Sequence, residues 1–233
     1  MRYNWKTYGA YFLIIGILLL CTCLGSHAVT VFSENEKVER KTCVIIDPGH
    51  GGEDGGAVSW SGQPESMYNL EISFRLKDLM NLLGYNAKLT RSSDISIYTK
   101  GETLAQKKAS DLKERVMIIN STEGGVLLSI HQNYYSDDRY SGAQVFYAKT
   151  PGSDQLAKEL QSAFVAALNP GSRRQAKKSS GIYLMDHIQC PGILIECGFL
   201  SNPQEDKNLK DPEYQKKLCS VISTVAAQYL SNT

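Results

Sequence analysis

The sequence predicts an α/β fold, a single-domain three-layer sandwich in which helices flank a mostly parallel central sheet. Short apolar runs typical of buried strands alternate along the chain with segments whose apolar residues recur at helical spacing. This alternation is typical of a parallel sheet covered on both faces. With 233 residues the chain is long enough to bury one full hydrophobic core. It contains no internal repeat, so we expect one domain.

Apolar runs bounded by polar or turn-forming residues predict the strands. In chain order they are Thr42–Asp47, Asn86–Thr90, Gly125–His131, Ala143–Ala148, a weaker run at Ile182–Met185, and Gly192–Glu196. The intervals between them predict helices over Glu65–Leu83, Leu104–Ile119, Ser153–Leu168 and Glu213–Leu230. The first helix is indicated by Ile72, Leu76 and Met80 on one face, and the last by the equivalent stripe of Leu218, Ile222 and Val225.

The first residues of the chain have the composition of a leader. Arg2 and Lys6 precede the apolar run Tyr11–Leu24, and Ser26-His27-Ala28 supplies the small residues of a cleavage site. The run is short for a membrane-spanning helix, yet an uncleaved anchor is an alternative because the uncharged stretch extends beyond it. A lipoprotein is a more distant alternative. We expect a signal peptide or N-terminal membrane anchor over residues 1–28, a linker over residues 29–41 and the folded domain over residues 42–233.

A histidine follows the first predicted strand directly, in the stretch Asp47-Pro48-Gly49-His50-Gly51-Gly52. This order places an imidazole at the carboxyl end of a strand, which is where α/β folds bind their ligands. Gly51 and Gly52 leave space beside the ring and allow backbone angles that other residues avoid. A single loop histidine is more often an ordinary polar residue, so the interpretation depends on what else lies at this edge.

Two further side chains complete a possible metal site. Glu65 lies at the start of the first predicted helix, after Pro64, and His131 closes the strand-like run that begins at Gly125. Two histidines and a glutamate from adjacent elements form the ligand set of a catalytic zinc site, which keeps one position for water. A structural zinc site usually has four protein ligands and favours cysteine. We therefore expect His50, Glu65 and His131 to bind a catalytic metal ion.

Glu196 closes the strand predicted from Gly192. An ionised carboxylate at the end of a buried strand is costly unless it is paired or close to a cation. A metal ion at the same sheet edge would provide that cation. We therefore expect Glu196 to act as the general base on water activated by the metal.

These segments, with Thr90-Arg91-Ser92-Ser93-Asp94 between them, resemble the zinc-dependent N-acetylmuramoyl-L-alanine amidases of bacterial cell walls. The resemblance covers roughly residues 42 to 230. It implies one Zn²⁺ per chain, held by His50, Glu65 and His131, with Glu196 as the catalytic glutamate. The family's glutamate-x-x-x-Asn-Leu pattern selects Glu65 over the neighbouring glutamates Glu53 and Glu71. Residues 42–233 are then the amidase catalytic domain.

A narrower resemblance involves the segments Ser141–Tyr147, Ile182–Met185 and Gly198–Pro203. Together they are similar to the spore-cortex amidases of endospore formers, which remove the stem peptide before muramic-δ-lactam is built. The resemblance implies peptidoglycan as the substrate. It also implies an exported protein that works outside the cytoplasmic membrane, in the cell wall or the forespore intermembrane space.

Other residues near these motifs suggest supporting roles. We expect Arg91 and Asp94 to form a local ion pair that fixes a loop, with Arg91 near the substrate or behind the ligands. Asn133 follows His131 closely enough to orient a ligand or a substrate amide. Tyr134, Tyr135 and Tyr140 are candidates for the wall of the groove, or are plain surface aromatics. The remaining histidine of the domain, His187, is expected in a loop at the rim of the cleft.

Partners and alternatives follow from composition. The formal net charge of +1 gives no reason to expect nucleic acid. The glycine-rich stretch Gly51–Gly62 predicts a loop that is mobile unless something holds it, so we expect an accessory protein or substrate to promote zinc binding and activity. We expect no disulfide among the domain cysteines. A catalytically silent peptidoglycan-binding module and a zinc deacetylase of wall amino sugars are the alternative functions.

Overall fold

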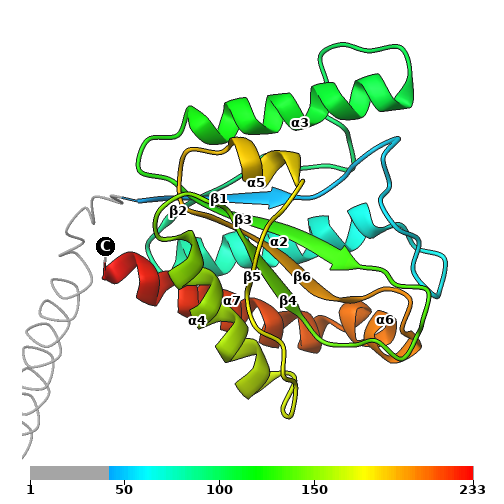
Figure 1. The fold of residues 1–233 in the computed structure, drawn as a ribbon, viewed down its shortest axis with the longest axis vertical. Helices are drawn as coiled ribbons and strands as arrows, with labels where there is room; N and C mark the ends of the chain where they lie inside the picture. Colours follow the sequence, from blue (N-terminus) through cyan, green and yellow to red (C-terminus); the bar gives the residue numbers. More distant parts are fainter. Residues whose placement is uncertain (1–41, 233) are drawn as a thin grey trace, which may run out of the picture. The chain divides into compact units, whose positions relative to one another are not determined.

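The computed structural model describes residues 42–232, which contain one six-stranded sheet in the order β2-β1-β3-β6-β4-β5 (Figure 1). The strands are β1 (Cys43–Pro48), β2 (Asn86–Leu89), β3 (Val126–Asn133), β4 (Gln144–Tyr147), β5 (Lys177–Lys178) and β6 (Gly192–Phe199). β2, β1, β3 and β6 are parallel neighbours, whereas β4 runs antiparallel to β6. The predicted mostly parallel sheet is therefore confirmed.

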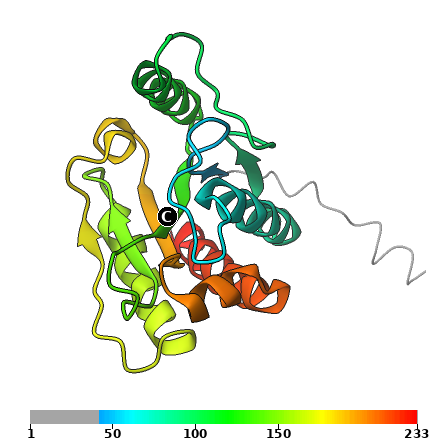
Figure 2. The ribbon, with the colours of Figure 1, turned by 90° about the vertical axis from the view of Figure 1, so that its right-hand side faces the viewer.

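Helices cover both faces of this sheet. They are α2 (Glu65–Leu82), α3 (Leu104–Asn120), α4 (Ser153–Ala167), α5 (Tyr183–His187), α6 (Pro203–Lys210) and α7 (Pro212–Ser231). One apolar cluster joins the sheet to α2, α4 and α7, and a second joins it to α3 and α5. The single-domain, three-layer α/β fold is as the sequence predicts. The carboxyl ends of β1 and β3 point to the right in Figure 1 and face the viewer in Figure 2.

Successive side chains of β1 point to opposite faces of the sheet, so this strand packs against the helices on both faces. Val44 and Ile46 point into the cluster with α2, and Cys43 and Ile45 point into the cluster with α3. All of them are buried, so the strand reads as a continuous apolar run, as strands covered on both faces do. Asp47 follows on the α3 side, where it pairs with Arg115 of α3 at 2.6 Å.

The start of α2 is fixed by the loop that precedes it. Its N-cap residue, Pro64, offers no side-chain cap. Instead the N–H of Glu65 donates to Ala57 O at 2.8 Å and the N–H of Ser66 donates to Gly55 O at 3.0 Å. Carbonyls of the loop thus satisfy the first amides of the helix. Consequently, the loop and Glu65 hold each other in place.

Three elements differ from the sequence-based expectation. The run Ile182–Met185, expected as a weak strand, contains the start of the short helix α5, and an apolar run of this length fits either structure. β5 and α6 were not expected. α6 is strongly polar, although Asn202 caps it and Pro203 occupies its first turn, a start signal visible in the sequence.

The expected leader and linker lie outside the described residues, so their predicted boundaries stay predictions. The described residues 42–232 belong to one compact unit. Within residues 42–232, no helix is both long and apolar enough to cross a membrane. The cysteines Cys43, Cys190, Cys197 and Cys219 carry free thiols.

Candidate metal centre

His50 sits in a tight turn immediately after β1. Its backbone has φ of 60°, a left-handed conformation that is uncommon for any residue with a side chain. The preceding residue must be glycine, because a Cβ on Gly49 would lie 2.2 Å from Nε2 of His131. Strained backbone persists only where surrounding contacts fix it, and such positions concentrate at functional sites. The turn therefore brings the two imidazole rings together.

The structure brings together the three predicted metal ligands. Nε2 of His50 lies 3.3 Å from Oε2 of Glu65, and Nδ1 of His131 lies 3.0 Å from Oε1 of the same carboxylate. The two rings meet edge to face, with centroids 5.0 Å apart. One potential ligand atom from each residue lies within 4.8 Å of the others. Nitrogen and oxygen ligands in this number fit a zinc ion with an open coordination position.

Glu65 is held as a carboxylate. The backbone N–H groups of Ala57 and Gln132 each donate to it at 3.1 Å, and Nδ2 of Asn69 donates at 3.2 Å. Burial by itself would raise its pKa, but the hydrogen bond and charge of His131 and the bond from Gln132 bring the pKa of Glu65 down to about 2. The site thus holds an ionised ligand carboxylate at neutral pH.

A carboxylate behind His50 escaped the sequence-based reasoning. Oδ2 of Asp54 lies 3.0 Å from Nδ1 of His50 and 3.0 Å from Nζ of Lys108. Hydrogen bonding to His50 is the main cause that lowers the pKa of Asp54 well below its usual range. A carboxylate on the far nitrogen of a ligand histidine fixes the tautomer and orientation of the ring.

We therefore predict that Asp54→Asn weakens zinc binding by about tenfold to a hundredfold, the usual cost of losing such a carboxylate. Competition with a chelator measures the affinity. Glu53→Gln is the matched control, because Glu53 also pairs with a lysine, Lys107 at 2.7 Å, but contacts no histidine. Equal zinc affinity in the Asp54 variant and the control would contradict this role.

Glu196 lies on β6 directly opposite His131 on β3. Its Oε2 is buried and has no hydrogen-bond partner among the described residues. Burial is the main cause that raises the pKa of Glu196 to about 7, with His131 acting in the opposite direction and Glu65 adding to the rise. A half-buried carboxylate with a free oxygen and a pKa near neutrality can both accept and return a proton.

Two buried arginines hold the turn that carries His50. Arg91 donates from Nε to Pro48 O at 2.9 Å, and from Nη2 to Gly49 O and Ser66 O, each at 3.0 Å. Its Nη1 donates to Ser93 O at 2.9 Å. Arg91 is buried, with 3% of the residue exposed. It thus acts behind the ligands, through the backbone of the turn.

Arg115 of α3 is the second of these arginines. Nη1 pairs with Asp47 at 2.6 Å and donates to Pro48 O at 2.8 Å, while Nη2 donates to His50 O at 2.7 Å. Nε pairs with Asp111 at 2.6 Å. Although burial would lower it, the two carboxylates raise the pKa of Arg115 above its usual range. A fully charged network is therefore buried under the metal site.

The expected ion pair between Arg91 and Asp94 is wrong. Arg91 makes its hydrogen bonds to backbone carbonyls, and Oδ1 of Asp94 instead accepts from the N–H of Gly52 at 3.1 Å. Both residues still fix the loop, but separately. A short stretch of sequence shows which charges are close in the chain and not which carbonyls a fold presents to them.

Gln132, next to Asn133, contacts the ligand group, and the role expected of Asn133 toward a ligand or a substrate amide stays a prediction. Nε2 of Gln132 donates to Oδ1 of Asn69 at 3.2 Å, and its backbone N–H reaches Glu65. The backbone carbonyl of Asn133 accepts from Leu200. His187 ends the helix α5 rather than standing in a loop, and it stacks on Tyr183 with ring centroids 3.9 Å apart.

The loop between His50 and Glu65 is held at several points. The N–H of Gly51 donates to Asp54 O at 2.8 Å, and Oγ of Ser96 donates to Gly51 O at 2.6 Å. The ion pairs of Glu53 and Asp54 with lysines of α3 add two further attachments. The sequence predicts a loop that is mobile unless something holds it, and these hydrogen bonds and ion pairs hold it within the domain itself.

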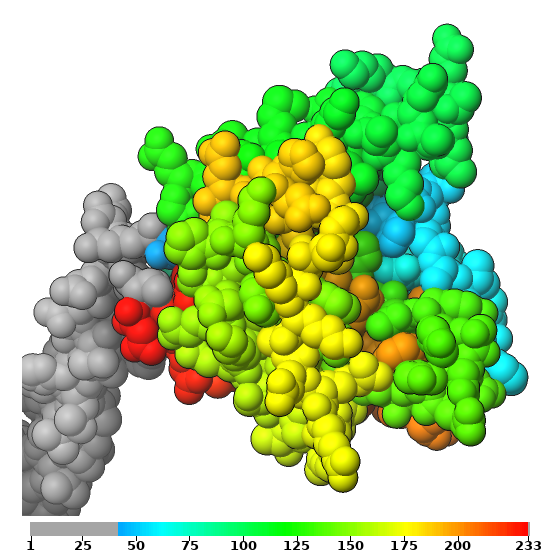
Figure 3. All heavy atoms as spheres, viewed as in Figure 1, coloured from blue at the N-terminus to red at the C-terminus, as the bar shows by residue number. Residues whose placement is uncertain are grey.

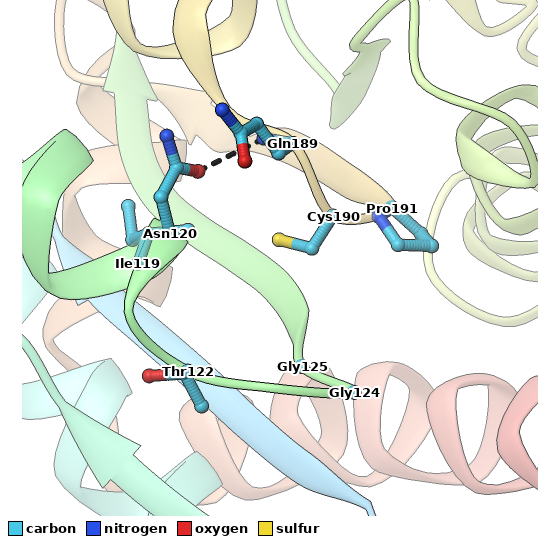
Figure 4. Close-up of a pocket in the computed structure, with 8 residues that line it drawn as sticks. All are labelled: Ile119, Asn120, Thr122, Gly124, Gly125, Gln189, Cys190 and Pro191. Carbon is cyan, nitrogen blue, oxygen red and sulfur yellow. Dashed lines mark hydrogen bonds between the residues drawn. The ribbon is translucent and has the colours of Figure 1, made fainter.

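The pocket beside the ligands lies between the sheet and the layer of α3 and α5. His50, Asp54, Lys108, His131 and Tyr183 are among the residues that line it. Another pocket lies at the opposite, amino end of β3 and β6 (Figure 4). Its lining contains no acidic or histidine side chain, and consists of Ile119, Asn120, Thr122, Gly124, Gly125, Gln189, Cys190 and Pro191. Cys190 is the only ionisable side chain in this lining, and one thiol by itself does not form a metal site.

Comparison with known proteins gives consistent matches. Residues 44–227 match the N-acetylmuramoyl-L-alanine amidase family. The chain is 40% identical over 190 residues to the germination-specific N-acetylmuramoyl-L-alanine amidase of Bacillus subtilis, covering 81% of this chain and 79% of that protein. Its fold is similar to the CwlD amidase of Clostridioides difficile, solved in complex with the GerS lipoprotein, with 36% identity, a TM-score of 0.78, and coverage of 82% and 99%.

A second solved structure, an N-acetylmuramoyl-L-alanine amidase of Clostridium difficile 630, is 28% identical with a TM-score of 0.72 and covers 84% of this chain and all of that one. The matches extend over the described sheet and helices rather than over one motif.

Proposed function

The chain belongs to the N-acetylmuramoyl-L-alanine amidase family, and from that membership we propose that it hydrolyses its substrate with one zinc ion held by His50, Glu65 and His131. The bond is the amide between N-acetylmuramic acid and L-alanine of peptidoglycan. The observation that carries the proposal is the convergence of these three side chains within 4.8 Å, directly beside Glu196 on the neighbouring strand.

The residues of the chain divide the chemistry between them. A zinc ion held by His50, Glu65 and His131 would supply a Lewis acid, which would lower the pKa of a water molecule and polarise the scissile carbonyl. Glu196 accepts the proton of the attacking water on its free Oε2 and passes it to the departing amine of L-alanine. Asp54 keeps His50 in the orientation in which Nε2 faces Glu65. Arg91 and Arg115 keep the backbone of the turn in place.

We predict that His50→Ala and His131→Ala each abolish stoichiometric zinc binding and amidase turnover, because two remaining ligands are too few for a catalytic zinc site. Zinc content of the purified full chain and competition with a chelator give a readout that does not depend on activity. His187→Ala is the control, since that histidine lies on α5 outside the ligand group. Full zinc occupancy in either ligand variant would refute the assignment.

The products distinguish this function from the alternatives. An amidase releases whole stem peptides from peptidoglycan, whereas a zinc deacetylase of wall amino sugars releases acetate. Mass spectrometry of digested muropeptides separates the two. A silent binding module would leave muropeptides unchanged even with zinc bound, although a free carboxylate at Glu196 has no purpose in such a module.

We further propose that the substrate is spore cortex, that the protein is exported, and that an accessory protein assists it. The germination-specific relative supports the first point, and the relative solved with a lipoprotein supports the last. Repeating the zinc titration with an added partner protein measures whether the partner raises zinc affinity. Tight binding and full turnover without any partner would remove the need for one.

A further inference from the structure

Four exposed aromatic side chains lie around the segment Phe199–Ser201, just beyond Glu196. Trp60 is 64% exposed, Tyr134 55%, Tyr135 51% and Tyr140 47%. We call these four residues the aromatic rim. Contiguous exposed apolar surface on a folded domain marks an interaction site more often than scattered residues do.

Backbone hydrogen bonds attach the rim to the end of β6. The N–H of Trp60 donates to Leu200 O at 2.8 Å, and the N–H of Leu200 donates to Asn133 O at 2.8 Å, next to Tyr134. The N–H of Tyr135 donates to Oγ of Ser201 at 3.3 Å. In Figure 3 the segment after β3, in green, projects at the lower right beside the cyan loop before α2. The rim therefore lies at the carboxyl end of β3 and β6, the same end of the sheet at which His131 and Glu196 stand.

A buried polar network fixes the turn that carries Trp60. The hydroxyl of Tyr68 donates to the carboxylate of Asp206, and Oδ2 of Asp206 accepts from the N–H of Ser61 at 2.9 Å. The same hydroxyl lies 3.0 Å from Oγ of Ser59. Tyr68 and Asp206 are both buried. An exposed indole is thus held on an ordered turn, and preorganisation of this kind lowers the entropic cost of binding.

The tyrosine side of the rim is also ordered. The rings of Tyr135 and Tyr140 meet edge to face with centroids 4.6 Å apart, and Tyr140 lies 6.1 Å from Phe199. Arg174 covers the ring of Phe199 at 5.0 Å and donates to Ser141 O. These contacts restrict the rings of Tyr135 and Tyr140, and both side chains stay exposed.

We propose that the aromatic rim binds the sugar rings of the glycan strand that flank the muramoyl residue whose amide is cleaved. This rests on the proposed function, because that substrate brings a sugar ring directly next to the scissile bond. One face of a sugar ring presents C–H groups that pack on aromatic faces. The edge of the sugar carries hydroxyl and N-acetyl groups that need hydrogen-bond partners. Within residues 42–232, neither the three tyrosine hydroxyls of the rim nor the indole N–H of Trp60 forms a hydrogen bond.

The first test compares substrates of different length. Trp60→Ala and Tyr135→Ala should each lower kcat/KM on long glycan strands by about tenfold, the equivalent of one lost stacking contact. The loss should be several-fold smaller on a single muramoyl-peptide, which does not reach the rim. Leu82→Ala, at an 82% exposed position at the far end of α2, should change neither value. Equal losses on long and short substrates would overturn the proposal.

The second test measures binding without hydrolysis. The chain has only two tryptophans, Trp5 and Trp60, so the full chain with Trp5→Phe reports on the rim alone. Titration with glycan strands freed of their peptides should change its fluorescence saturably, and Glu196→Ala should leave that change intact. Retained glycan binding in an inactive chain thus separates this proposal from the proposed function. The absence of a saturable fluorescence change would overturn the proposal. Co-sedimentation with insoluble glycan measures binding by Trp60→Ala, which lacks the reporter. A Trp60→Ala chain that binds glycan as wild type does but no longer binds an accessory protein would also overturn it.

Discussion

Glu196→Gln lowers kcat by about 10²- to 10⁴-fold, the range expected for loss of a general base, while zinc binding stays at the wild-type level. Glutamine keeps the volume of the side chain but cannot accept a proton. Stopped assays on peptidoglycan give kcat, and chelator competition gives zinc affinity. Full turnover in Glu196→Gln, or in Glu196→Ala, would exclude this residue as the base.

The same variant has a second expected effect, on stability. Oε2 of Glu196 is buried without a partner, and burial is the main cause that raises its pKa to about 7. Removing such a group relieves the cost of desolvating it. The metal-free Glu196→Gln chain should therefore unfold at the same denaturant concentration as wild type or at a higher one. A clearly lower midpoint would show that the side chain stabilises the fold and would weaken the interpretation of its lost activity.

Arg115→Met destabilises the fold by about 3–5 kcal/mol, because it leaves buried carboxylates without their cation. Asp47 and Asp111 both pair with Arg115 at 2.6 Å. Denaturant unfolding of the metal-free chain measures the change. Adding Asp47→Asn to Arg115→Met should recover part of the loss by removing one unpaired charge. Arg139→Met is the control, because the Arg139–Asp137 pair at 2.6 Å is exposed to solvent.

The destabilisation caused by Arg115→Met should become smaller as the pH falls. Burial would raise the pKa of Asp47, but Arg115 and the hydroxyl of Thr90 hold it below the usual range. A carboxyl group with a depressed folded-state pKa contributes stability above its unfolded pKa and loses it as pH falls through the folded value. The difference between wild type and Arg115→Met should therefore shrink in acid. A difference that stays constant from neutral to acidic pH would contradict the charge-based explanation.

The sequence predicts His50, Glu65, His131 and Glu196 because each lies at or next to the end of an element whose position follows from a local pattern. His50, His131 and Glu196 each end or follow a buried strand, and parallel strands bring their carboxyl ends to one edge. The pairing of β1, β3 and β6 is therefore enough to bring these three side chains to one edge of the sheet. The family resemblance then selects Glu65 from its neighbours.

Of the residues that support the ligands, the sequence predicts Arg91 but neither Asp54 nor Arg115. Arg115 acts through carboxylates and backbone carbonyls that include groups far away in the chain. Asp54 is only four residues from His50, but its contact depends on how the loop between them folds. On sequence alone Arg115 is one charged helix position among several. The short apolar run at Ile182 was assigned to a strand because its length does not distinguish a strand from one helical turn.

His131 and Glu196 face each other across two adjacent parallel strands, in a register set by backbone hydrogen bonds. Their separation therefore depends on strand pairing and not on the loops that surround the pocket. Insertions, deletions and exchanges in those loops can alter which polymer is recognised while the proton-transfer geometry stays the same. Chemistry and specificity can accordingly diverge at different rates in evolution, and grafting the segment after β3 from a relative offers a route to a changed wall preference without rebuilding the catalytic pair.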